Sequence, residues 1–252
     1  MTGGLHIALA AERLGSVFGI PITNTLVTAW VVIAFLIIAG FLVGRKATLV
    51  PGKVQSAFEM LFEFVLEYME QTLGTRALAE RFFPLIASIF LFIFTANMVE
   101  FFPLLGSIGI NENGTFIPLL RAATTDLNIT LSLAIISFVV IEVSGVLSLG
   151  ALKYASKFVN FKGGAMGLAV GLLEIIGNLA RLVSFSFRLF GNIFAGEVLI
   201  AVASLFFPYL LPVPLMLFET FVGLLQAAVF ALLTLVFIKL AIMEPHGAEV
   251  HQ

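Results

Sequence analysis

The sequence contains no cysteine. Disulfide bonds, thiolate metal sites and cysteine nucleophiles are therefore excluded. Charged residues are also scarce, at 11% of the 252 residues, whereas soluble domains contain about 25%. The formal net charge of -2 is too small to indicate a nucleic-acid partner, and we expect none.

Residues that carry common enzyme chemistry are missing as well. There is no Walker-type phosphate loop, so we expect no nucleotide chemistry in this chain. There are no paired intramembrane aspartates, and the three histidines, His6, His246 and His251, lie near the two ends, which disfavours an intramembrane protease. We also expect no cofactor and no metal site.

Apolar residues are abundant, at 60% of the chain, and the mean hydropathy is +1.13. Several apolar runs exceed the about 18–20 residues that are needed to cross hydrocarbon. This composition predicts an all-α integral membrane protein that forms one membrane domain over residues 1–252. We expect about five membrane-embedded helices, at residues 24–44, 83–103, 125–149, 166–207 and 215–243.

The segments between these runs differ in character. Residues 1–23 lack a basic signal-peptide start and are interrupted by Glu12 and Arg13, so we expect a segment at the membrane surface. Residues 104–123 are predicted to be a loop and residues 150–164 a basic linker. Thr124 or Thr125 is expected to cap the next helix, with Asp126 in its first turn.

Residues 51–74 are predicted to form an amphipathic helix that lies in the interface or packs beside other helices. Four acidic residues recur on one face of this helix at steps of three or four: Glu59, Glu63, Glu67 and Glu70. This acidic stripe is either a docking face for a partner or a solvated face.

The positions of lysine and arginine predict the orientation of the chain. With the N-terminus outside and the C-terminus inside, eight of these residues fall on the cytoplasmic side: Arg45, Lys46, Lys53, Arg76, Arg81, Lys153, Lys157 and Lys162. Only Arg13 and Arg121 fall outside, which agrees with the positive-inside rule.

Residues 166–207 are too long for a simple span. An unbroken helix of this length measures about 63 Å, whereas the hydrocarbon core is about 30 Å thick. The helix is therefore steeply tilted, kinked or partly outside the membrane. Its polar residues are three or four positions apart and share one face: Glu174, Asn178, Arg181, Ser184, Arg188 and Asn192.

Arg188 is the residue that most needs an explanation. A charge at membrane depth costs a few kcal/mol, on the order of 3 kcal/mol by insertion scales. Glu197 lies nine positions further along, on the opposite face, and so cannot be its simple ion-pair partner within one helix. Glu197 and Glu219 flank a proline-rich link and could share a polar pocket, while Glu142 is a second intramembrane charge.

Three functions fit these features. The first is proton translocation coupled to another protein, in which Arg188 meets carboxylates that come and go. The second is a self-contained secondary transporter or channel, although we find no inverted repeat. The third is a scaffold subunit in which Arg188 belongs to a structural ion pair.

The run Arg188-Leu189-Phe190-Gly191-Asn192-x-x-Ala195-Gly196-Glu197, followed by Leu225-Gln226-Ala227, closely resembles subunit a of the F-type ATP synthases. The runs at residues 97–103 and 125–130 resemble two further motifs of that family, so the resemblance extends over most of the chain. It implies a stator subunit in which two long tilted helices lie against a rotating ring of c subunits. Two proton half-channels then open to opposite sides of the membrane.

The resemblance also implies roles for individual residues. Arg188 matches the essential arginine that faces the ring carboxylates, releases their protons and blocks a leak. The outer half-channel is matched by Asn192, Glu197, Glu219, Gln226 and, more weakly, Glu100. The inner half-channel is matched by Glu174, Asn178 and Ser184. Many relatives pair a Glu with a His at the positions of Glu197 and Glu219, so it is open which of these two glutamates relays the proton.

The partners implied by the resemblance are the c-subunit ring, b-type peripheral stalk subunits and the lipid membrane, with one copy of this chain in a hetero-oligomeric complex. The location implied is an energy-coupling membrane, the bacterial inner membrane in the first instance. Any enzymatic role is that of a proton-translocating subunit of a rotary ATP synthase. The transported ion is H⁺ or Na⁺, and we favour H⁺.

Overall fold

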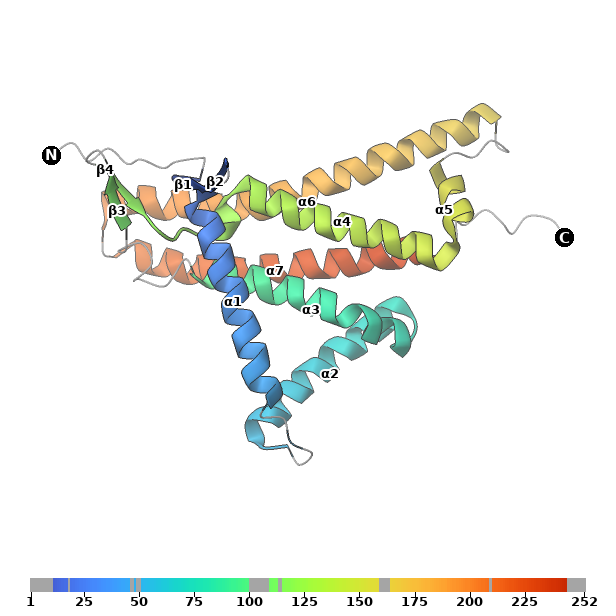
Figure 1. Cartoon of the computed structure of the whole chain (residues 1–252), viewed down its shortest axis with the longest axis horizontal. Helices are drawn as coiled ribbons and strands as arrows, with labels where there is room; N and C mark the ends of the chain where they lie inside the picture. Colours follow the sequence, from blue (N-terminus) through green and yellow to red (C-terminus); the bar gives the residue numbers. More distant parts are fainter. Residues whose placement is uncertain are drawn as a thin grey trace.

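The computed structural model describes residues 11–17, 19–45, 48, 51–99, 109–112, 115–158, 164–208 and 210–243. Helices dominate these residues (Figure 1). The α-helices are α1 Asn24–Arg45, α2 Lys53–Leu73, α3 Arg76–Val99, α4 Leu127–Leu149, α5 Ala151–Phe158, α6 Gly164–Phe206 and α7 Pro212–Ile242, with a short 3-10 helix η1 at Ala123–Thr125. Two antiparallel hairpins, β1 Arg13–Val17 with β2 Ile20–Thr23 and β3 Gly109–Glu112 with β4 Thr115–Pro118, lie on the side where α6 and α7 join.

Five of the helices, α1, α3, α4, α6 and α7, are long and apolar enough to cross a membrane. This confirms the predicted all-α integral membrane protein. Helices α3, α4, α6 and α7 share a core in which Ile93, Leu189 and Phe230 are almost fully buried. Many large side chains on the outside of this bundle, such as Trp30 and Phe35 on α1, are exposed, as lipid-facing residues must be.

The helices α6 and α7 are much longer than a bilayer requires. They contain 43 and 31 residues, or about 65 Å and 47 Å at 1.5 Å per residue. They run side by side near their link and separate toward the N-terminal end of α6 (Figure 1). The link is tighter than predicted, because α7 begins at Pro212 rather than at residue 215. A proline is tolerated in a first turn, where its missing N–H has no partner in any case.

Two other boundaries correct the sequence-based expectations. The second membrane helix begins at Arg76 rather than Phe83, and it accommodates Pro84 within its length. The cap of α4 is Asp126 rather than Thr124 or Thr125, because its carboxylate accepts the backbone N–H of Asn128 at 2.9 Å.

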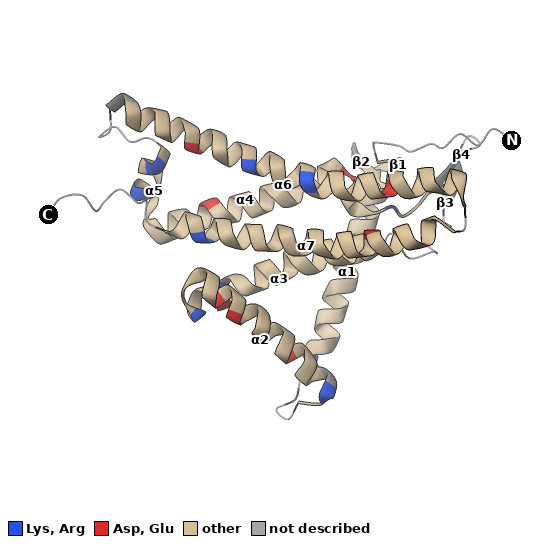
Figure 2. Ribbon diagram, turned by 180° about the vertical axis from the view of Figure 1, so that it is seen from behind, with Lys and Arg blue, Asp and Glu red and all other residues tan. Residues whose placement is uncertain are grey.

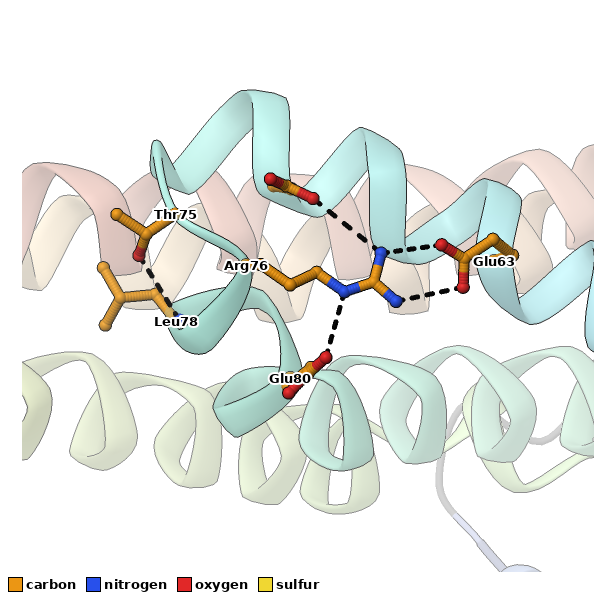
Figure 3. A network of polar contacts seen from close by, with 6 residues as sticks. Glu63, Thr75, Arg76, Leu78 and Glu80 are labelled. Carbon is orange, nitrogen blue, oxygen red and sulfur yellow. Dashed lines mark hydrogen bonds and ion pairs between the residues drawn. The ribbon is translucent and has the colours of Figure 1, made fainter.

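The amphipathic helix α2 returns along the α1–α3 side of the molecule and is fastened to α3 by Arg76 (Figure 3). The guanidinium of Arg76 binds both carboxylate oxygens of Glu63, at 2.8 and 3.0 Å, and also contacts Glu70 and Glu80. The hydrogen bond from Arg76 lowers the pKa of Glu63. Two members of the acidic stripe, Glu63 and Glu70, thus contact a cation of the chain itself, so the stripe is neither wholly free for a partner nor merely solvated.

The predicted basic linker contains a helix, α5, that packs against the ends of α4 and α6. Two glycines make this packing possible. The ring of Tyr154 lies against Gly145 of α4, and the carbonyl oxygen of Phe158 lies against Gly171 of α6, so closely that a Cβ atom at either glycine would collide with it. Small residues allow such close approach between helices in membrane proteins.

The close packing of α5 against α6 can be tested with Gly171→Ala. The added methyl group meets backbone that cannot rotate away, so we expect a loss of about 1–3 kcal/mol in the free energy of unfolding. Gly177→Ala, on the same helix with open space around it, is the matched control and should be neutral or stabilising by about 0.5–1 kcal/mol. Thermal melting of the purified chain in detergent, followed by circular dichroism, measures both; equal midpoints for the two variants would contradict the packing described here.

Candidate functional site

Charged residues are sparse on α6 and α7, and along α6 two basic positions lie between two acidic ones (Figure 2). Arg188 lies on the exposed side of this helix, and its neighbours Phe185 and Leu189 are buried in the core. Within the described part of the chain, Arg188 makes one hydrogen bond, from Nη2 to Ser184 Oγ at 3.3 Å, and no ion pair. A neutral hydroxyl does not balance the charge, so the guanidinium remains available to an acidic group from outside this chain.

One turn beyond Arg188, a hydrogen bond joins the two long helices. Asn192 Nδ2 donates to Gln226 Oε1 at 2.6 Å. Gln226 is buried, and among the described residues its Nε2 donates to no partner. The pair therefore fixes the amide of Gln226, and the two N–H donors of its buried Nε2 have no partner among the described residues.

Glu197 forms an ion pair with Arg121, at 3.0 Å between Oε2 and Nη2, and the two side chains are 30% and 11% exposed. The backbone N–H of Arg121 is in turn held by Thr28 Oγ1 of α1 at 3.1 Å. The partner of Glu197 thus comes from the segment before α4. Glu197 can face this segment because it lies about half a turn around α6 from Arg188. Arg121 was not predicted as a site residue, since in the sequence it is marked only by its position as one of two cations on the outer side.

Glu219 has a different environment, although it lies beside Glu197. Its side chain is only 4% exposed, and its carboxylate packs against Gly196 so closely that a Cβ atom there would collide with it. Within the described residues, Glu219 Oε1 accepts no hydrogen bond. Glu219 of α7 is therefore brought to the part of α6 that carries Glu197, but among the described residues only Glu197 has an arginine partner.

Two further polar residues fix the frame around this region. Asn97 of α3 donates to the carbonyl oxygen of Gly223 in α7 at 3.1 Å and accepts from Thr124 at 2.6 Å. Asp126 accepts from Thr25 of α1 at 2.8 Å, in addition to capping α4. These contacts are structural ties between helices. Glu100, the weaker candidate of the outer set, lies outside the described residues.

A separate polar cluster lies toward the other end of α6. Glu142 of α4 accepts from Asn178 Nδ2 at 3.2 Å and from the Tyr154 hydroxyl at 2.9 Å. Glu174 is half-buried close by and interacts electrostatically with Tyr154. Asn178 and Glu174 of the predicted inner set therefore lie in one cluster, whereas Ser184 contacts Arg188 instead.

Burial and the hydrogen bond to Glu142 raise the pKa of the Tyr154 phenol, so this hydroxyl stays protonated and serves as a donor. Arg181, between the cluster and Arg188, lies over the ring of Phe237 at 4.1 Å. Among the described residues, no three acidic or histidine side chains are arranged to hold a metal ion.

Comparison with known proteins gives a consistent result. The family model of the ATP synthase A chain matches residues 26–239. The chain is 32% identical to ATP synthase subunit a of Moorella thermoacetica, over 87% of this chain and 90% of that protein. It is 33% identical to ATP synthase subunit a, sodium ion specific, of Propionigenium modestum, over 91% and 78% of the two chains. A subunit a of Campylobacter jejuni is 35% identical, over 84% and 86%.

The ion pair between Arg121 and Glu197 predicts a measurable coupling energy. In a double-mutant cycle with Arg121→Gln and Glu197→Gln, the two changes should be non-additive by about 1–3 kcal/mol, because each single variant already removes the whole of this partly buried ion pair. Thermal unfolding of the purified chain in detergent measures the cycle. The exposed pair Arg76 and Glu63, treated in the same way, is the control and should couple by only about 0.2–1 kcal/mol. Additive effects at Arg121 and Glu197 would show that the ion pair is absent.

Proposed function

The chain belongs to the ATP synthase A chain family, the proton-translocating subunits of the membrane sector of F-type ATP synthases, and from this premise we propose which of its residues move the proton. As a multi-pass membrane subunit of that family, it works in a complex with other subunits of the membrane sector. The partner of Arg188 that we propose is the set of carboxylates on a rotating c-subunit ring. It also places b-type stalk subunits in the complex and the chain in a bacterial inner membrane, with its N-terminus outside.

The observation that carries the proposal is the environment of Arg188. The arginine is exposed on an apolar helix and has only the Ser184 hydroxyl as a described partner. A guanidinium keeps its proton at any ordinary pH, so it cannot conduct protons by titrating. It can instead favour the ionised form of a carboxyl group that comes close to it. A protonated ring carboxyl that reaches Arg188 therefore loses its proton to water in one path, and the resulting carboxylate is reprotonated from the other path.

The outer path is assigned to Asn192, Glu197, Gln226 and Glu219. We assign the last relay step to Glu219. Glu197 has Arg121 as a counter-ion, so its carboxylate is stabilised where it stands. Glu219 is buried and has no counter-ion among the described residues, and an unpaired buried carboxyl is less costly when neutral than when charged. Glu219 is therefore suited to take up a proton and to hand it on to a ring carboxylate.

The inner path is assigned to Ser184, Asn178 and Glu174, which lie toward the N-terminal end of α6. The ion is assigned as H⁺, since carboxylates such as Glu219 can accept and release a proton. Because one relative is described as sodium ion specific, the experiments below use sodium-free buffer.

Arg188→Ala is expected to abolish ATP synthesis, because no group would then discharge the ring carboxyls or separate the two paths. The measurement is ATP synthesis driven by a pH gradient in membrane vesicles that contain the assembled complex, in sodium-free buffer. Arg45→Ala, at the exposed end of α1, is the control and should leave synthesis unchanged. Synthesis by Arg188→Ala near the wild-type rate would overturn the role of this arginine.

Glu219→Gln is expected to slow proton transfer by about 100-fold, because it removes a positioned proton carrier but keeps its shape. Passive proton flux through the membrane sector, measured after the catalytic sector has been stripped from the vesicles, reports this step. Gly196→Ala should slow the flux as well, because its methyl group displaces the carboxylate of Glu219. Glu197→Gln is the comparison, and a larger effect there than at Glu219 would reverse the assignment of the relay.

A further inference from the structure

Glu142 is an acidic side chain in an apolar membrane helix that the proposed function does not yet use. Its two carboxylate oxygens accept from different helices: Oε2 from the Tyr154 hydroxyl of α5 at 2.9 Å, and Oε1 from Asn178 Nδ2 of α6 at 3.2 Å. Within the described residues it forms no ion pair. Both of its partners are neutral donors, so the carboxylate is oriented without being neutralised.

The position of the Tyr154 hydroxyl is set by the whole of α5. Tyr154 is 6% exposed and rests on Gly145, while Phe158 closes on Gly171. Lys157 lies 5.5 Å from the centre of the Tyr154 ring and donates to the carbonyl oxygen of Leu240, near the end of α7, at 3.4 Å. Helix α5 thus touches α4, α6 and α7 and holds one hydroxyl at the carboxylate of Glu142.

The charged groups near this cluster do not replace its neutral partners. On α6, Glu174 and Arg181 lie close enough to Tyr154 to interact with it electrostatically, and Arg181 is stacked over Phe237 of α7. Helix α5 carries two cations, Lys153 and Lys157, and Lys157 is directed to the end of α7. The carboxylate of Glu142 thus has the neutral donors of Tyr154 and Asn178 as its direct partners, while Glu174 and Arg181 lie further away. A carboxylate in such surroundings can bind and release a proton.

The cluster of Glu142, Tyr154 and Asn178 also lies where the inner path is expected, between Arg188 and the end of α6 that carries α5. Asn178 precedes Arg188 by ten residues, or about 15 Å along the helix, toward the end that carries α5. Ser184 and Arg181 occupy the turns between them. A proton that leaves a ring carboxyl at Arg188 through the inner path would therefore pass toward Glu142.

We propose that Glu142 is the proton acceptor of the inner path, and that Tyr154 and Asn178 are the positioning residues that hold its carboxylate. This inference rests on the proposed function. In the step, the ring carboxyl gives its proton to water, one oxygen of Glu142 accepts the proton, and the same O–H bond then breaks to release it to water on the α5 side. Each oxygen of Glu142 keeps a lone pair free for the proton while it accepts its hydrogen bond.

The test uses vesicles that contain the assembled complex with the catalytic sector removed. Passive proton flux is driven by a potassium diffusion potential and divided by the amount of assembled complex, measured through an epitope tag on this chain. Glu142→Gln should lower this flux by about tenfold or more, and Glu142→Asp should restore most of it. Tyr154→Phe, which keeps the ring on Gly145, should lower the flux by about fivefold. Ser137→Ala, a buried polar change in the same helix, is the control and should have no effect.

A second readout separates a proton acceptor from a structural tie. In the wild type, flux should depend on the pH of the solution on the α5 side, and Glu142→Gln should flatten that dependence because the titrating group is gone. If Glu142→Gln lowers only the amount of complex, with normal flux per complex and an unchanged pH profile, the cluster is a structural tie and the inference is wrong. Failure of Arg188→Ala to abolish synthesis would instead overturn the proposed function, so the two failures are distinguishable.

Discussion

The cost of placing a charge in hydrocarbon accounts for most of the polar architecture of this protein. Arg121 is paired with Glu197, and Arg181 is stacked on Phe237. Glu142 holds two hydrogen-bond donors. Arg188 alone among these groups has no more than a hydroxyl within the described residues. Since an arginine at membrane depth is retained only for a function or a partner, this difference supports our proposal that Arg188 acts on another protein.

Glycine is the second requirement, because polar side chains can enter the bundle only where a neighbouring helix leaves room. The carboxylate of Glu219 occupies the space beside Gly196, and the phenol of Tyr154 occupies the space beside Gly145. Asn97 reaches α7 at Gly223, where an added Cβ atom on the glycine would lie 3.1 Å from the Cβ atom of Asn97. In water, a helix bundle is held together by burial of apolar surface. In lipid, close packing of small residues and interhelical hydrogen bonds must supply the attraction, and both occur together beside Gly145 and Gly223.

Sequence patterns were sufficient for some of these features and not for others. Long apolar runs predict the membrane helices, and the period of 3.6 residues predicts that Arg188 and Glu197 face different neighbours. The partners themselves depend on which segments are adjacent in space. The sequence alone therefore could not predict that Arg121 pairs with Glu197, or that Tyr154 donates to Glu142. Helix α5 was missed because its lysines and short length are typical of a linker. The predicted cap of α4 was one or two residues too early. The structure uses Asp126 instead, whose carboxylate accepts hydrogen bonds from the backbone N–H of Asn128 and from Thr25 of α1, a helix that is distant in sequence.

The spacing of the polar groups along α6 bears on how a proton could cross. Asn178 and Glu197 are nineteen residues apart, or about 28 Å, which is close to the thickness of the hydrocarbon core. Arg188 lies midway between them. In the proposed function each polar set serves one half of this length of α6, and Glu197 of the outer set lies on the opposite side of the helix from Arg188. A proton that enters by one set cannot leave by the other without a mobile carrier, and a fixed cation at the midpoint repels any proton that moves directly. Under the proposed function, this geometry makes rotation of the partner the one route that connects the two paths.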